Sequence, residues 1–184
     1  MLAELDAVLA RKSPGSRGAL ALLLVAALAK QRLTVLVDRM LPLLVVLNAA
    51  GWLGCWFEGC AYGLPAGSAW WGLPVRDDWG QVTRRFPLQP VGALLGLAIP
   101  WIVEMTLLRR GLRPGAHPGW LGALSLLGFA LVSLALSFLR GDPTLLWYGL
   151  RPEAWGALGL MGTGAFMLIY IYLLEHRSQD KRKA

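Results

Sequence analysis

The chain has 184 residues, of which 56% are hydrophobic and only 16% are charged. The charged residues lie in short groups between apolar blocks rather than along amphipathic helix faces, which argues against a soluble enzyme and is typical of an integral membrane protein. The formal net charge of +7 comes from lysines and arginines beside the apolar segments, where they anchor helix ends to lipid headgroups, so we expect no nucleic-acid partner.

The apolar segments predict an all-α protein, a polytopic integral membrane helix bundle. After an N-terminal tail at residues 1–17, apolar segments follow at residues 18–29, 41–57, 91–108, 121–139 and 154–174. Because roughly 20 helical residues cross the hydrocarbon core, these predict about five transmembrane segments. The first is short and either snorkels Lys30 and Arg32 or only dips into the membrane. Residues 18–174 therefore form the predicted transmembrane domain, followed by a basic C-terminal tail at 175–184.

The longest connection, residues 64–90, is predicted to be a loop on the membrane surface. Its Trp70, Trp71 and Trp79 fit an interfacial belt, where an indole keeps an apolar body and a wet N–H group. Lysine and arginine are slightly more frequent on the side that carries the C-terminal tail. This difference favours a cytoplasmic C-terminus and an external loop.

A patch rich in glycine and cysteine, GWLGCWFEGCAYG, ends the second apolar segment. Glycines let another backbone or a ligand approach closely, and a carboxylate such as Glu58 is costly in lipid. We expect Cys55 and Cys60 to pack as small apolar residues, although a disulfide between them is also possible. The sequence has neither a C-x-x-C pair nor a histidine cluster, so we expect no metal site and no cofactor.

Three stretches in this order carry a resemblance to a known family: DRMLPLLVVLNAAGWLGCWFEGCAYG, RRFPLQP and LSFLRGDP, followed by a last apolar helix. Over residues 16–174 they resemble the prolipoprotein diacylglyceryl transferases of bacterial inner membranes. The motif frame of the family is kept by Gly51, Gly54, Cys55, Gly59, Cys60 and Gly63.

The resemblance implies that the chain is a multi-pass protein of a bacterial plasma membrane. It also implies the reaction that the chain catalyses. Family members transfer the diacylglyceryl group of phosphatidylglycerol to the thiol of a lipobox cysteine in a secreted precursor, and they release glycerol phosphate. The implied partners are therefore phosphatidylglycerol and the signal peptide of a prolipoprotein. The chain is shorter than family members, so it is either a reduced relative or a chain whose gene start is placed too late.

Several charged positions of the family motifs carry other residues here. Trp52 stands where the family has arginine, and Gly92 stands where the RRFPLQP region of the family has glutamate. In the segment at 121–139, Ser133 and Ser137 occupy an arginine and a glutamate position. Arg140 matches the last arginine of that motif. No residue of the chain is identified as the general base.

The predicted phospholipid headgroup site consists of Arg140, Glu58, Gln89 and Arg85. Arg140 either binds a phosphate bidentately or is a helix-end arginine paired with Asp142. Glu58 either accepts hydrogen bonds from a lipid glycerol or is solvated at the interface. Gln89 and Arg85 are expected to contact the headgroup, although an amide cannot serve as a base near neutral pH.

Two functions remain open on the sequence. One is diacylglyceryl transfer with substituted site residues. The glycine frame and the order of the segments support this function. The other is a non-catalytic relative that binds a lipid or a membrane partner, which the lost charges favour. An inherited fold does not by itself carry the chemistry.

Overall fold

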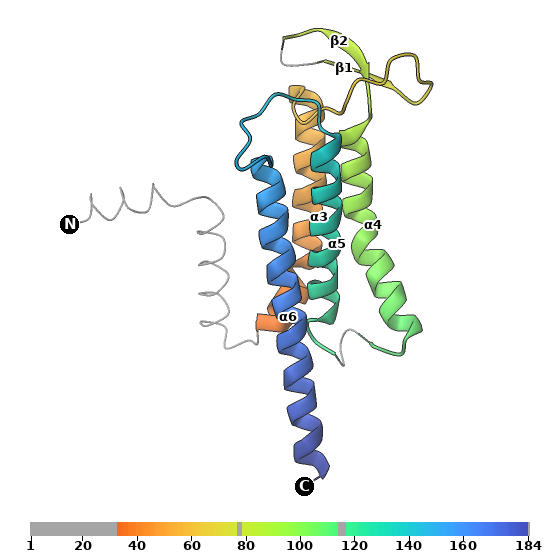
Figure 1. Ribbon diagram of the computed structural model, residues 1–184. Coiled ribbons are helices and arrows are strands. Elements are labelled where there is room, and N and C mark those ends of the chain that lie inside the picture. Colours follow the sequence, from red (N-terminus) through yellow and green to blue (C-terminus); the bar gives the residue numbers. More distant parts are fainter. Residues whose placement is uncertain (1–32, 77–78, 114–116, 184) are drawn as a thin grey trace, which may run out of the picture.

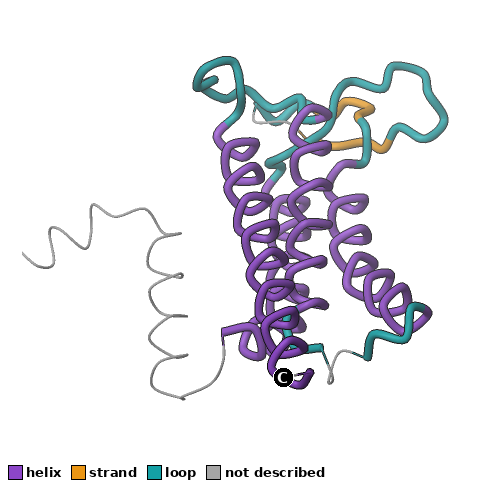
Figure 2. Tube along the Cα trace, turned by 60° about the horizontal axis from the view of Figure 1, so that its bottom comes forward, coloured by secondary structure: helices purple, strands orange, loops and turns teal. Residues whose placement is uncertain are grey.

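The computed structural model describes residues 33–76, 79–113 and 117–183, with side chains to residue 176. Four helices lie side by side as a bundle, and a short antiparallel hairpin covers one end of it (Figures 1 and 2). The elements are α3 (Leu33–Glu58), β1 (Leu73–Arg76), β2 (Val82–Arg85), α4 (Leu88–Arg109), α5 (Trp120–Leu139) and α6 (Pro152–Lys183).

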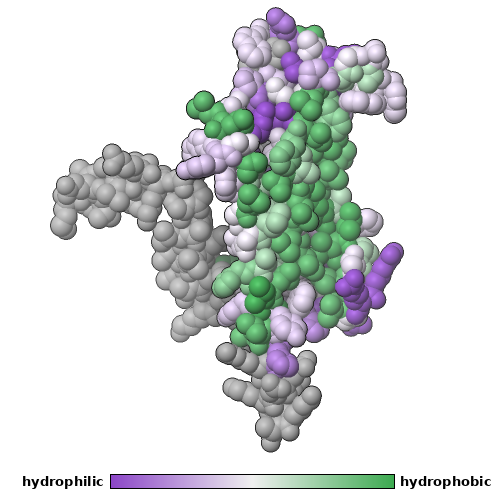
Figure 3. Space-filling model, viewed as in Figure 1, coloured by the Kyte–Doolittle hydropathy of each residue, from purple (hydrophilic) through white to green (hydrophobic). Residues whose placement is uncertain are grey.

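The described helices confirm the prediction of a membrane helix bundle but change the number of spans. Helices long and apolar enough to cross a membrane number four in the described part, at Thr34–Glu58, Leu88–Arg109, Trp120–Leu139 and Pro152–His176. The predicted segment at 18–29 lies outside the described residues. Large apolar side chains cover the outside of the bundle, which shows a continuous hydrophobic side in Figure 3 with hydrophilic residues gathered at both of its ends.

Helix α3 extends to the N-terminal side of the predicted apolar segment and includes a carboxylate that has a structural role. The Asp38 side chain accepts hydrogen bonds from the backbone N–H groups of Gly119, at 2.6 Å, and Gly122, at 2.7 Å. These amides belong to the start of α5, where unpaired N–H groups and the helix dipole favour an anion. Hydropathy alone excluded Asp38 from the membrane helix, whereas its charge is held by the neighbouring helix.

Small residues bring the helices close together in the core. A Cβ atom on Gly96 of α4 would lie 1.9 Å from Nδ2 of Asn48, and one on Gly128 of α5 would lie 2.6 Å from Ile99. Such close contacts are typical of helix packing in membranes, where small residues let backbones approach. Two buried clusters fill the interior: Leu41, Ile99 and Phe129, and Ala123, Met167 and Ile171.

The hairpin was not predicted for the connection at 64–90. Its strands pair from Leu73 opposite Arg85 to Arg76 opposite Val82. They are only 4 residues long each, too short for an alternating apolar pattern to stand out, and their few β-branched residues are a weak local strand signal. The hairpin lies at the end of the bundle opposite the C-terminus (Figure 1).

Candidate functional site

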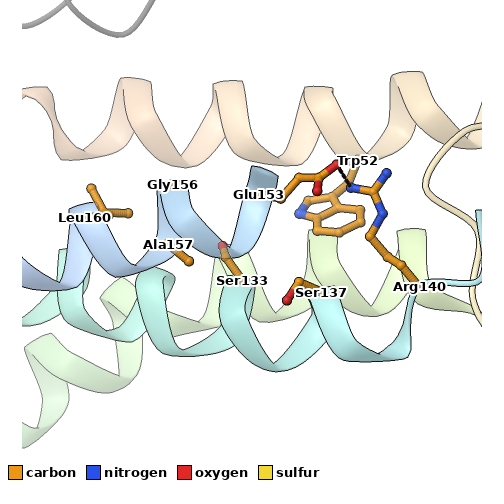
Figure 4. A pocket seen from close by; sticks show the side chains of 8 residues that line it. All are labelled: Trp52, Ser133, Ser137, Arg140, Glu153, Gly156, Ala157 and Leu160. Carbon is orange, nitrogen blue, oxygen red and sulfur yellow. Dashed lines mark ion pairs between the residues drawn. The ribbon is translucent and has the colours of Figure 1, made fainter. Parts of the chain in front are cut away.

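A cavity of about 260 Å³ opens between α3, α5 and α6, and we call it the Arg140 slot. The helical spacing of its lining residues explains why they share it, because residues three and four apart lie on the same face of a helix. The lining residues are Trp52 of α3, Ser133 and Ser137 of α5, Arg140 directly after α5, and Glu153, Gly156, Ala157 and Leu160 of α6 (Figure 4).

The Arg140 slot has a polar end and an apolar end. Arg140 caps α5 and Glu153 lies in the first turn of α6, so both are at the hairpin end of the bundle. Figure 4 shows Arg140, Glu153 and Trp52 together at one end of the slot, and Leu160 at the other. Leu160 lies about two helical turns deeper along α6 than Glu153. The slot thus runs from charged groups near the membrane surface toward apolar residues inside the span.

The charged groups at the polar end form a network. Arg140 donates from Nε to Oδ1 of Asp142 at 2.9 Å and pairs through Nη2 with the second oxygen of that carboxylate. Its Nη1 lies 3.0 Å from Oε1 of Glu153. Arg151 adds a second cation, with Nη1 3.3 Å from Oδ1 of Asp142. The predicted pairing of Arg140 with Asp142 is confirmed, and two arginines face two carboxylates.

The network shifts the pKa values of its buried members. Burial by itself would raise the pKa of Asp142, but hydrogen bonding from Arg140 and the charges of Arg140 and Arg151 outweigh burial and hold that pKa below its ordinary value. The hydrogen bond to Asp142 raises the pKa of Arg140 above its ordinary value, against the opposing effect of burial. Both groups therefore stay ionised near neutral pH.

Main-chain contacts from the glycine-rich patch hold Arg140 in place. Gly63 forms an antiparallel bridge with Arg140, and the N–H group of Gly141 donates to the carbonyl oxygen of Tyr62 at 2.8 Å. A Cβ atom on Gly63 would lie 2.4 Å from the carbonyl oxygen of Phe86, so the close approach requires glycine at this position. This part of the patch thus positions the arginine rather than lining the slot.

A disulfide joins Cys55 and Cys60, so the expectation that both cysteines only pack as small apolar residues is wrong. The helix ends at Glu58, and Gly59 with a φ of +75° turns the chain so that Cys60 returns to Cys55. The N–H group of Cys60 donates to the carbonyl of Cys55, and the amide of Gln89 donates to the carbonyl of Cys60, each at 2.9 Å. The turn that leads to Gly63 is therefore fixed from both sides.

The structure brings only Arg140 of the predicted headgroup residues into the slot. Glu58 is exposed at the end of α3. Gln89 is fully buried against the Cys60 turn. Arg85 is 9% exposed, and its guanidinium lies 4.3 Å from the ring centre of Tyr62. The glycines Gly51 and Gly54 have no described atom within 4 Å of an added Cβ.

Sequence reasoning did not single out Glu153 or Arg151. Arg151 lies directly before α6 and Glu153 lies in its first turn, so nothing in the sequence next to Arg140 marks them as its partners. A signal was present in the sequence RPEAW, where an acidic residue follows a proline at the first turn of a helix. Its position on the same side of the membrane as Arg140 would have made Glu153 a candidate ion-pair partner.

The family model described as prolipoprotein diacylglyceryl transferase matches residues 16–170. The chain belongs to the prolipoprotein diacylglyceryl transferase family. No curated protein and no solved structure shows a significant match. Arg140, Trp52, Ser133 and Ser137, which the sequence resemblance aligns with motif positions, all line the slot. The residues aligned in this way therefore lie together in the structure.

Two of the replaced positions contact each other. The indole of Trp52 lies so close to Gly92 of α4 that an added Cβ would be 2.4 Å from Cε2 of the ring. The sequence resemblance aligns these two positions with an arginine and a glutamate, which have opposite charges. Here a large aromatic residue packs on a residue without a side chain. The two substitutions are thus matched in size, and the indole remains half-buried at the wall of the slot.

Proposed function

We propose that the chain binds a phospholipid in the Arg140 slot, with the headgroup at the polar end and an acyl chain along α6. The observation that carries this proposal is the course of the cavity from paired charges at the hairpin end to Leu160 within the span. This course matches the order of chemical groups along a phospholipid at a membrane surface. Family membership supports the same class of ligand.

Arg140 can bind a lipid phosphate if one of its two carboxylate partners is displaced from the guanidinium. The Asp142 side chain is 11% exposed and holds the guanidinium through two nitrogens, whereas the Glu153 side chain is 40% exposed and holds it through one. Glu153 is therefore the partner that moves. A phosphate oxygen would then replace its carboxylate on Nη1, in a charge-assisted hydrogen bond.

The wall formed by α6 leaves room for an acyl chain. A Cβ atom added to Gly156 or to Gly159 would meet no described atom within 4 Å. Gly156 lines the slot and Gly159 does not. Together with Ala157 and Leu160, Gly156 forms a shallow apolar surface, against which an alkyl chain packs by dispersion and by exclusion of water.

A second candidate function is diacylglyceryl transfer from phosphatidylglycerol to the cysteine thiol of a prolipoprotein, which the family match favours. The reaction needs a cation on the phosphate and a deprotonated thiol. Arg140 supplies the cation. Among the residues that line the slot, Glu153 is the group able to accept the thiol proton.

We propose further that the C-terminus is cytoplasmic and that the slot opens on the external side.

The binding proposal is tested by the phospholipid that remains on the purified full chain, measured by native mass spectrometry. Gly156→Leu places an isobutyl group in the slot and should reduce bound phospholipid at least about tenfold, since it removes the space for the ligand. Gly159→Leu is the matched control, because it adds the same side chain to the same helix outside the slot. Equal lipid content in both variants would contradict the proposal.

The transfer proposal has a separate readout. Membranes that contain the full chain are given labelled phosphatidylglycerol and a lipobox peptide, and labelled peptide is measured. Transfer that Glu153→Gln abolishes while lipid stays bound would assign the proton acceptor. Absence of transfer in a preparation that binds phospholipid would leave lipid binding as the function.

A further inference from the structure

The charges of the Arg140 slot are balanced, and this balance limits the ligand. Arg140 and Arg151 are matched by Asp142 and Glu153, all joined within 3.3 Å. An anionic headgroup placed on Arg140 would displace Glu153 and leave a carboxylate without its cation beside a phosphate. Unpaired charge of one sign in a half-buried site is costly. The slot therefore has no surplus positive charge to offer a purely anionic headgroup.

A zwitterionic headgroup preserves the number of ion pairs. Its phosphate takes the place of the Glu153 carboxylate on Arg140, and its ammonium takes the place of Arg140 on Glu153. The carboxylate that must move is the more exposed one of the two, at 40% against 11%. Because both exchanged partners keep an opposite charge, binding does not leave any of the four protein charges unpaired.

Trp52 supplies a further feature for a cation at this end of the slot. Its indole lies with Glu153 and Arg140 at the polar end (Figure 4) and is backed by Gly92. The face of an indole attracts an ammonium group, more strongly where water is partly excluded. An arginine at this position would instead repel the ammonium and attract a second phosphate oxygen.

We infer that the slot takes a phospholipid whose phosphate carries a primary ammonium group, of the phosphatidylethanolamine class. This inference rests on the proposed lipid binding and names its headgroup. The phosphate binds Arg140, and the ammonium binds between the carboxylate of Glu153 and the ring of Trp52. A primary ammonium fits better than a quaternary one, because only its N–H groups donate hydrogen bonds to the carboxylate.

The test is competitive binding to the full chain in detergent, read by native mass spectrometry. Phosphatidylethanolamine, phosphatidylglycerol and phosphatidylcholine with identical acyl chains are offered in equal amounts. We expect phosphatidylethanolamine to be bound about tenfold better than phosphatidylglycerol. Soluble glycerophosphoethanolamine is added as a competitor, and competition equal to that of the lipid would contradict a membrane source of the ligand.

Variants separate the two halves of the headgroup site. Glu153→Gln removes the partner of the ammonium and frees Arg140, so it should lower the preference for phosphatidylethanolamine about tenfold and raise binding of phosphatidylglycerol. Trp52→Leu removes the aromatic ring beside the ammonium, so it should lower the preference for phosphatidylethanolamine over phosphatidylglycerol by a few fold. Glu58→Gln is the control, since it removes an exposed carboxylate at the same end of the bundle but outside the slot. Glu153→Asp, which keeps the charge, should retain the preference.

The outcomes distinguish this inference from the proposed function. If wild type binds phosphatidylglycerol as well as phosphatidylethanolamine and Glu153→Gln changes nothing, the headgroup assignment is overturned, while lipid loss in Gly156→Leu would still support the slot. If Gly156→Leu does not reduce the binding of any phospholipid, both the proposed lipid binding in the slot and the headgroup assignment are overturned. A preference that Glu153→Gln reverses supports both.

Discussion

At the scale of single residues, the contact between Trp52 and Gly92 determines the shape of the slot wall. Gly92→Ala would place a Cβ 2.4 Å from a ring atom, and a rigid indole cannot yield as the end of a flexible chain does. We expect the free energy of unfolding of this variant to be about 1–3 kcal/mol lower than that of the wild type. We also expect the variant to lose bound lipid. Thermal unfolding in detergent measures this. Gly156→Ala, which adds the same methyl group in open space, should not destabilise.

The charge of Asp142 makes a second prediction at this scale. The pKa of Asp142 is lowered in the folded protein. Its contribution to folding stability is therefore fully present above the ordinary carboxyl pKa of about 4, and it is lost as pH falls through the lower pKa of the folded protein. Asp142→Asn should cost about 2 kcal/mol at pH 7, as loss of charged hydrogen bonds does. Unfolding measured from pH 7 to pH 3 should show this difference shrinking below about pH 4. A difference that does not depend on pH would contradict the ion network.

Contacts between residues close together in the sequence were easier to predict than contacts between distant ones. The pairing of Arg140 with Asp142 could be predicted because the two are neighbours after one helix. Glu153 could be named at most as one candidate partner, because its contact depends on how α6 begins relative to α5. The disulfide was left as one of two alternatives, since cysteines separated by 5 residues meet only when the helix ends between them.

At the scale of elements, the turn closed by Cys55 and Cys60 connects α3 to the segment that positions Arg140 through Gly63. Opening the disulfide should lower stability by about 2 kcal/mol, as expected for a short closed loop. Amide hydrogen exchange around Tyr62 and Gly141 should rise at the same time, because their hydrogen bond depends on the path of the turn. Unfolding and exchange with and without reductant measure both effects. The double variant Cys55→Ser and Cys60→Ser is the control, and a response of this variant to reductant would exclude the disulfide as the cause.

The helices themselves were predicted well because long apolar runs fix their type and place. Their ends were predicted less well. Helix α3 extends past its apolar run through Asp38, whose charge is compensated by amides of α5, and α6 continues to Lys183 into the predicted basic tail. Compensation by a distant element is invisible in a hydropathy window, and so is a hairpin with strands of 4 residues.

At the scale of the whole molecule, the account requires the hairpin end and the C-terminus on opposite sides of the membrane. With the native cysteines replaced by serine, a cysteine introduced at Ser68, which is exposed, should react with an impermeant maleimide added to intact cells. A cysteine at Ser178 should react only after permeabilisation. The reverse pattern would place the slot on the cytoplasmic side and contradict the proposed orientation.

The central claim is that the Arg140 slot holds a phospholipid, and mapping the contact tests it most directly. A phospholipid with a photoreactive group next to its phosphate is incorporated with the full chain into nanodiscs, irradiated, and located by peptide sequencing. We predict crosslinks at Trp52, at Ser137 to Arg140 and at the first turns of α6, and their loss in Gly156→Leu but not in Gly159→Leu. Crosslinks spread evenly over the outer helix faces, unchanged in Gly156→Leu, would contradict it.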